Sequence, residues 1–149
     1  MNDNETLNIK IAADTEDDRQ IFMETLREIK VKTIITFVND GYQLINHLNT
    51  PGLRLPDVVI LDLNMTLSDG VDCLHQIRKN SQLKDLVIVL YTTEVSEEKA
   101  EEAFVRGANI YIQKSNDLLT MKARLAQVIN LNLQYLTLGL KKENFLLKV

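Results

Sequence analysis

The sequence predicts an α/β protein in which five parallel strands form a sheet that helices cover on both faces. Strand-like and helix-like segments alternate along the 149 residues, with short connections between them. Two of the strand-like segments, residues 57–62 and 86–91, are nearly continuous apolar runs, which is typical of parallel strands buried on both faces. Alternation of this kind indicates right-handed crossovers that place the helices over the sheet.

The first half of the chain predicts three strands and two helices. Residues 7–13 alternate apolar and polar side chains, as a strand does, and stop at Asp14. Thr15 and Asp18 have the spacing of a capping box, so a helix should begin there. The remaining elements are a β-branched strand at 31–38, a short helix from about Tyr42, a loop at 51–56 and the buried strand that ends in Asp62.

The second half predicts two more strands and three helices. The chemistry of residues 68–70 favours a helix start, and the strand at 86–91 finishes at the hydroxyl pair Thr92 and Thr93. Ser96 is suited to cap the next helix and Gly107 to end it. The last predictions are that Val105 faces inward, that a strand at 109–113 delivers Lys114, and that a helix from about Asn116 ends no later than Gly139, with Leu118 and Leu119 on its apolar side.

Composition excludes several classes of function. The formal net charge is −4 and no basic run reaches five residues, so the electrostatic footprint of a nucleic-acid-binding protein is absent. Cys73 is the only cysteine, and it is expected to be packed in the interior. No apolar stretch is long enough to span a membrane, and the polar first residues are unlike a signal peptide, so we expect a cytoplasmic protein. His47 and His75 lack a second ligand at metal spacing.

The predicted topology brings several polar residues to one edge of the sheet. The expected strand order is 2-1-3-4-5, the flavodoxin-like order of open parallel sheets, whose crevice lies where the order reverses, between strands 1 and 3. Asp14 and Asp62 should therefore lie side by side. The carboxyl ends of strands 1, 3, 4 and 5 present Asp14, Asp62, Asn64, Thr92 and Lys114.

These residue types suit phosphoryl transfer. Two carboxylates, Asp14 and Asp62, with the backbone carbonyl of Asn64 make a hard oxygen site for Mg²⁺. Asp62 is the candidate nucleophile, and Lys114 with the Thr92 hydroxyl would contact the phosphoryl oxygens. The site therefore predicts an aspartyl phosphate formed with the help of a metal ion.

Over residues 7–133 the chain resembles the receiver domain of the two-component response regulators. The resemblance is carried by residues 62–65, Thr92, the run at 107–112 and Lys114. It implies a stand-alone signalling protein, not an enzyme, that accepts a phosphoryl group on Asp62 from a histidine kinase or a histidine phosphotransfer protein, with Mg²⁺ present. It also implies a switch in which Thr92 moves toward the phosphate and Tyr111 turns inward. That movement would remodel, for a downstream protein, the face formed by the helix after Ser96, the strand at 109–113 and the last helix.

Three positions depart from the family pattern and keep alternatives open. Ala13 stands where receivers carry the first of two acids, and because Asp14 is retained we expect Mg²⁺ binding to be weakened rather than lost. Glu16 and Asp17 are either substitutes for that acid or simple partners of the helix dipole. Thr66 and Ser115 stand where receivers carry proline, and we expect either a trans Lys114–Ser115 bond with a shifted lysine or a strained exception. The alternative function is a degenerate pseudo-receiver that binds proteins without phosphorylation. A flavodoxin-like or phosphatase-type enzyme ranks last, because there is no glycine-rich phosphate loop and Asn64 replaces a needed carboxylate.

The C-terminal segment lies beyond the resemblance. Residues 140–149 are too apolar for a solvated end, so the segment either folds back on the domain or meets a second chain, and a homodimer remains open. We expect residues 1–149 to form one receiver domain, with a core at 7–133 and an extension at 134–149.

Overall fold

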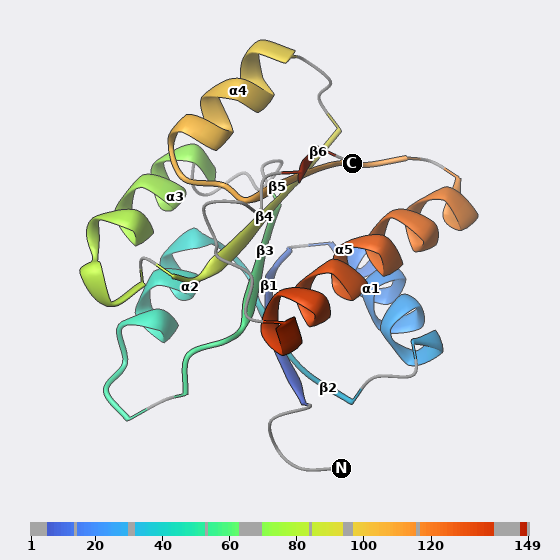
Figure 1. The fold of residues 1–149 in the computed structure, drawn as a ribbon, viewed down its shortest axis with the longest axis horizontal. Helices are drawn as coiled ribbons and strands as arrows, with labels where there is room; N and C mark the ends of the chain where they lie inside the picture. The colour runs from blue at the N-terminus through green and yellow to red at the C-terminus, as the bar shows by residue number, and fades with distance from the viewer. Residues whose placement is uncertain are drawn as a thin grey trace.

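The computed structural model describes residues 6–13, 15–29, 32–52, 54–62, 70–83, 85–93, 97–115, 117–138 and 147–148. These residues form one parallel sheet in the order β2-β1-β3-β4-β5-β6, with helices on both sides (Figure 1). The strands are β1 (Leu7–Ala12), β2 (Thr33–Val38), β3 (Val58–Asp62), β4 (Val87–Thr92), β5 (Ile110–Gln113) and β6 (Leu147–Lys148). The helices are α1 (Glu16–Glu28), α2 (Gly41–Leu48), α3 (Gly70–Lys79), the short 3-10 helix η2 (Ser81–Leu83), α4 (Glu97–Val105) and α5 (Leu118–Leu138). The predicted order 2-1-3-4-5 is confirmed.

Two buried layers hold the helices to the sheet. On one face, α1 and α5 pack against side chains such as Ile9, Ile60 and Val89. On the other face, α2, α3 and α4 pack against side chains such as Val59 and Leu90 (Figure 1). Since neighbouring residues of a strand point to opposite faces, the near-continuous apolar runs of β3 and β4 supply both layers.

The C-terminal segment adds a strand that the sequence analysis did not predict. Residues 147 and 148 pair in parallel with Ile110 and Tyr111 of β5. The chain therefore returns to its own sheet here, which is the first of the two alternatives raised for the tail.

Gly107 ends α4 as predicted, with a backbone that a side chain would strain. Its φ is +117°, and its N–H donates to Phe104 O at 3.1 Å while Ala108 N–H donates to Ala103 O at 3.0 Å. This pair of bonds is a Schellman motif, which satisfies carbonyls left over at the end of a helix. The predicted cap Ser96 lies outside the described residues.

Three apolar residues predicted to face inward are exposed instead. The exposed fractions are 86% for Val105, 44% for Leu118 and 75% for Leu119. At about 3.6 residues per turn, Val105 and Leu119 lie on the sides of α4 and α5 that point away from the buried residues of those helices. Leu118 shares the buried side of α5 but comes one turn before Met121, its first buried residue. The predicted face was therefore wrong for Val105 and Leu119, whereas Leu118 precedes the part of the helix that contacts the core.

Lys10 is buried in the middle of β1, although alternation along this strand suggested a polar face. Only 8% of Lys10 is exposed, and its Nζ lies 3.1 Å from Nδ1 of His47 in α2. β1 has a strand on each side in the sheet, and α2 lies over the face that carries Lys10, since His47 contacts its ammonium. Burial lowers the pKa of Lys10 below its ordinary value of 10.5.

Lys10→Met should raise the free energy of unfolding at pH 7. The lowered pKa means that the unfolded chain binds more protons than the folded one as the pH approaches 10.5, so wild-type stability rises with pH across that alkaline range. The variant should lose this rise. Urea unfolding at pH 7 and pH 10 measures both effects, and the exposed Lys79→Met is the control. If the free energy of unfolding rises equally with pH in wild type and in Lys10→Met, then Lys10 is not the group whose pKa is lowered by folding.

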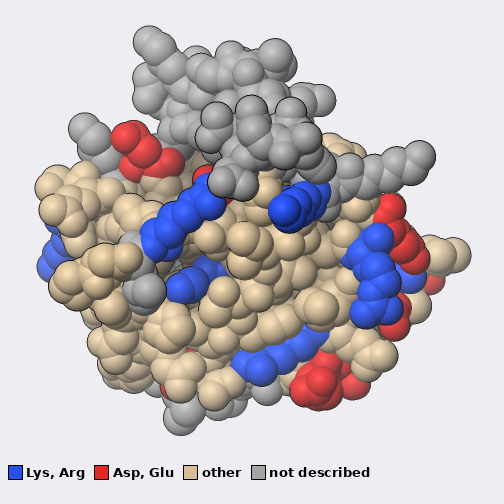
Figure 2. Space-filling view, turned by 90° about the horizontal axis from the view of Figure 1, so that it is seen from below, with Lys and Arg blue, Asp and Glu red and all other residues tan. Residues whose placement is uncertain are grey.

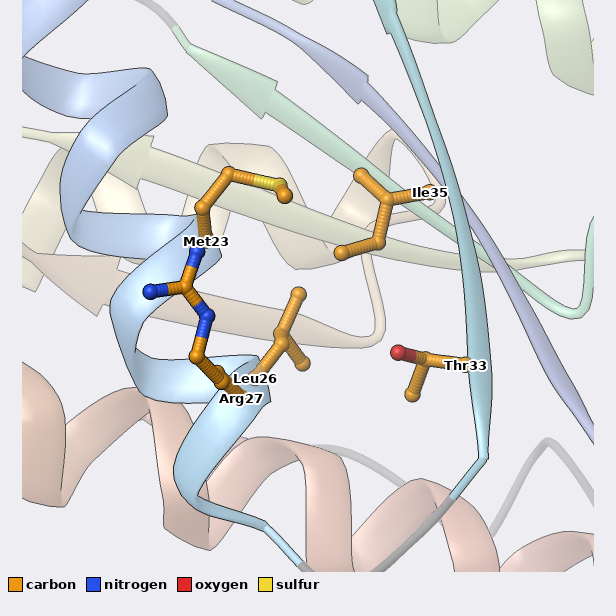
Figure 3. A pocket seen from close by; sticks show the side chains of 5 residues that line it. All are labelled: Met23, Leu26, Arg27, Thr33 and Ile35. Carbon is orange, nitrogen blue, oxygen red and sulfur yellow. The ribbon is translucent and has the colours of Figure 1, made fainter.

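A shallow hollow of about 260 Å³ lies between α1 and β2 (Figure 3). Its lining is Met23, Leu26, Arg27, Thr33 and Ile35. None of the polar residues predicted to gather at the carboxyl edge of the sheet contributes to it, so this hollow is separate from the candidate site.

Candidate functional site

Asp62 is the last residue of β3 and is almost completely buried, with 1% of the residue exposed. By strand alternation its side chain lies on the same face as Val58 and Ile60, which is the face that α1 and α5 cover. A buried carboxylate is costly unless it is paired. A cation near Asp62 would therefore be needed to offset the cost of burying its carboxylate.

Lys114 supplies that cation. It follows β5, and its backbone N–H donates to Thr92 O at the end of β4, at 2.7 Å. Its Nζ donates to Asp62 Oδ2 at 2.9 Å. Parallel strands that end at one edge thus bring Asp62, Lys114 and the backbone of Thr92 together, as the topology predicted.

The peptide bond between Lys114 and Ser115 is trans, since the described part of the chain contains no cis peptide bond. The sequence analysis tied a trans bond to a displaced lysine. The ammonium nonetheless reaches Asp62 at 2.9 Å.

Two polar residues of the site were missed by the sequence analysis. Asp18, in the first turn of α1, accepts a hydrogen bond from Lys114 Nζ at 3.1 Å through Oδ2. Tyr91 of β4 donates its hydroxyl to Asp18 Oδ1 at 3.4 Å. The available signal was that Asp18 follows Asp14 by about one helical turn and that Tyr91 directly precedes Thr92.

Glu16 and Asp17, which the sequence offered as substitutes for the acid missing at position 13, are exposed. Ala13 itself is fully buried, and its carbonyl accepts a hydrogen bond from Arg19 Nε at 2.9 Å. The described acid that reaches the site from the start of α1 is therefore Asp18.

Tyr91 lies beneath the lysine. The Lys114 ammonium is 4.7 Å from the centroid of the Tyr91 ring, close enough for a cation–π contact. Burial raises the pKa of the Tyr91 hydroxyl, and the negative charges of Asp18 and Asp62 raise it further. Tyr91 is therefore a neutral donor at physiological pH.

Thr92 and Tyr111 are both buried, each with 2% exposed. Tyr111 belongs to the same buried cluster as Ala100 and Ala103 of α4. A change in the position of this ring would therefore alter the packing beneath α4.

The predicted metal ligands are divided between described and undescribed residues. Asp62 is described, whereas Asp14, Asn64 and the family departure Thr66 lie outside the described residues. Within the described ranges no three acidic, histidine or cysteine side chains gather closely enough to hold a metal ion. The oxygen donor that is described, the Asp62 carboxylate, is of the type that Mg²⁺ prefers.

On the face shown in Figure 2, lysine and arginine side chains lie apart from one another, some among uncharged residues and others beside acidic ones, and do not gather into a basic patch. Among the described helices, none is both long and apolar enough to cross a membrane.

Comparison with known proteins gives a consistent result. The family model of the response regulator receiver domain matches residues 9–126. Chemotaxis protein CheY-3 of Vibrio cholerae is 30% identical over 125 residues, which cover 84% of this chain and 93% of that protein. Response regulator Rcp1 of Synechocystis is 26% identical over 114 residues, which cover 74% of this chain and 78% of that protein.

Solved structures show the same fold. The crystal structure of the Mn(2+)-bound form of Rcp1 aligns with a TM-score of 0.78 at 23% identity and covers 86% of this chain and 95% of that one. The phosphorylated cyanobacterial phytochrome response regulator RcpA aligns with a TM-score of 0.77 at 23% identity and covers 87% and 93%.

The sheet order and the matched family define a signalling module of two-component systems. The chain belongs to the response regulator receiver domain family. Receiver domains interact with histidine kinases and downstream proteins, and they generally bind Mg²⁺.

Proposed function

We propose that this chain accepts a phosphoryl group on Asp62 from a histidine kinase or a histidine phosphotransfer protein and signals through contact with another protein. The observation that carries the proposal is the buried ion pair of Asp62 and Lys114 at the carboxyl edge of the sheet, at 2.9 Å. Formation of an aspartyl phosphate requires a nucleophile and a cation that stabilises the phosphoryl oxygens. The Asp62 carboxylate and the Lys114 ammonium supply these two groups.

The transfer is an exchange of one bond to phosphorus for another. An oxygen of Asp62 bonds to phosphorus while the bond from phosphorus to the donor's imidazole nitrogen breaks, and that nitrogen keeps the electron pair. Lys114, already beside Oδ2, stabilises charge on the phosphoryl oxygens. The Thr92 hydroxyl, from the end of the neighbouring strand, is the proposed second contact.

The proposed metal site consists of the carboxylates of Asp14 and Asp62 and the backbone carbonyl of Asn64. Bound Mg²⁺ would neutralise charge on the incoming phosphoryl group. Two similar proteins support both parts of the proposal, since one is described as Mn(2+)-bound and the other as phosphorylated.

The proposed switch couples Thr92 and Tyr111 to the face formed by α4, β5 and α5. Tyr111 shares a buried cluster with Ala100 and Ala103 of α4, so movement of its ring would be transmitted to that helix. A downstream protein, or a second copy of the chain, would read the change. This is a local charge event that shifts the balance between two surface states.

The second candidate is a pseudo-receiver that binds its partner without phosphorylation. The buried Ala13 favours it, because a methyl group occupies the position of an acid in the family pattern. This candidate predicts that Asp62 is not phosphorylated and that Asp62→Asn leaves partner binding unchanged.

Acetyl phosphate and beryllium fluoride, each with Mg²⁺, test the proposal on the purified chain. We expect a mass increase of one phosphoryl group in wild type and none in Asp62→Asn. We also expect beryllium fluoride to shift NMR signals of Thr92, Tyr111 and α4. An unmodified wild type under saturating acetyl phosphate, with no shift by beryllium fluoride, would reject the phospho-acceptor and favour the pseudo-receiver.

A further inference from the structure

Lys114 is held by two acids rather than one. Its Nζ donates to Oδ2 of Asp62 at 2.9 Å and to Oδ2 of Asp18 at 3.1 Å. The Lys114 side chain is 14% exposed and that of Asp18 is 15% exposed, so water screens these contacts only partly. The described contacts of the ammonium thus fix it from the side of β3 and from the side of α1.

The ring of Tyr91 supports the same arrangement from below. The ammonium lies 4.7 Å from the ring centroid, and the Tyr91 hydroxyl donates to the second oxygen of Asp18 at 3.4 Å. Asp18 therefore has one oxygen on Lys114 and the other on Tyr91. This bridge leaves its carboxylate little freedom to rotate.

The direction of the Asp18 side chain departs from its expected role in the helix. Thr15 Oγ1 accepts from Asp18 N at 3.2 Å, as a capping residue does. In a capping box the acid three residues later turns back to the backbone of the cap. Among the described residues, however, the Asp18 carboxylate contacts Lys114 and Tyr91, which lie 96 and 73 positions away in the sequence.

We infer that Asp18 is a positioning residue that holds the ammonium of Lys114 against Asp62 in the unphosphorylated chain. The inference rests on the proposed function, in which Lys114 stabilises the phosphoryl group. A lysine has a long flexible side chain that loses rotamer entropy when it is fixed. Because Asp18 already holds the ammonium before the donor binds, this loss of rotamer entropy does not add to the free-energy barrier of phosphoryl transfer.

Asp18→Asn tests the inference, with Asp17→Asn as the matched control. Both changes remove one negative charge from the first turn of α1, but Asp17 is exposed and takes no part in the contacts described above between Lys114, Asp62, Asp18 and Tyr91. The first readout is the NMR signal of the Lys114 ammonium in the unphosphorylated protein, assigned by its loss in Lys114→Arg. We expect it in wild type and in Asp17→Asn, and we expect it to be broadened or lost in Asp18→Asn.

The second readout is the rate of phosphorylation by acetyl phosphate with Mg²⁺. We expect Asp18→Asn to be slower than Asp17→Asn by about tenfold, with the loss in the rate constant rather than in the half-saturating donor concentration. Tyr91→Phe, which keeps the ring but removes the hydroxyl that holds Asp18, should be slower by about twofold.

The two readouts separate failure of the inference from failure of the proposed function. If Asp18→Asn matches Asp17→Asn in both readouts, or is phosphorylated faster, the positioning role is rejected while the phospho-acceptor remains. If wild type is not phosphorylated, the proposed function fails. The Lys114 signal then decides alone whether Asp18 holds the lysine.

Discussion

Lys114→Met should lower the free energy of unfolding at pH 7 by about 3 kcal/mol, because it removes the ammonium that pairs with the buried Asp62 carboxylate. Asp62 is 1% exposed, and Lys114 Nζ donates to it at 2.9 Å. Methionine keeps an apolar stem above the Tyr91 ring, so the change isolates the charge. Urea unfolding measures the difference.

A double variant and a control show whether the ion pair is the cause. Lys114→Met combined with Asp62→Asn should recover most of the lost stability, since it also removes the negative charge that Lys114 balances. Lys122 is the matched lysine: it contacts Glu28 at 3.1 Å, but the Glu28 side chain is 64% exposed. Lys122→Met should therefore cost much less stability than Lys114→Met. Equal losses for the two single variants would contradict the buried pair.

The core of the site could be predicted from the sequence because topology alone determines it. Once strands and helices alternate, the sheet is parallel and the carboxyl end of each strand lies at one edge. Asp62 and Lys114 each follow from their place at a strand end, so their position at one edge of the sheet was predicted from the order of elements. Their direct ion pair was not predicted, because it depends on how the two side chains reach across β4.

Asp18 and Tyr91 could not be found in the same way. The capping pattern of Thr15 already gave Asp18 a sufficient local role, and nothing in the local sequence states which way its carboxylate turns. That direction depends on how closely α1 packs on the sheet, which Phe22 and its 5.2 Å ring contact with Tyr91 help to determine. Contacts between residues 18 and 91 are set by tertiary packing, not by local pattern.

The errors at Leu118 and Leu119 have a local origin. Both apolar side chains near the start of α5 were predicted to lie on its buried side, whereas burial depends on the angle of a residue around the helix axis and on where the helix first contacts the core. Leu119 lies on the side of α5 away from the buried residues, and Leu118 precedes the first buried residue, Met121. Which part of a helix is covered depends on neighbours that are distant in the sequence.

Arg78→Leu should lower the free energy of unfolding by about 3 kcal/mol, because three backbone or side-chain acceptors lose a charged donor. The guanidinium donates to Gly107 O at 3.0 and 2.8 Å, to Leu83 O at 3.0 Å and to Asn109 Oδ1 at 3.0 Å. Burial lowers the pKa of Arg78 to about 10, against a smaller opposing effect of Asp85. Its charge is therefore tolerated there through these hydrogen bonds.

The effect should reach the site because these acceptors surround the start of β5. Asn109 Oδ1 also accepts from Ile88 N of β4 at 2.8 Å, so Arg78 links α3 to the turn that positions the strand leading to Lys114. Arg106→Leu is the control, because the Arg106 side chain is 41% exposed and pairs only with Glu102 among the described residues. This variant should lower the free energy of unfolding by less than about 0.5 kcal/mol. Arg78→Lys keeps the charge but not the planar fork, so it should remain destabilised. If Arg78→Leu unfolds at the same urea concentration as Arg106→Leu, then β5 is held by its apolar contacts alone.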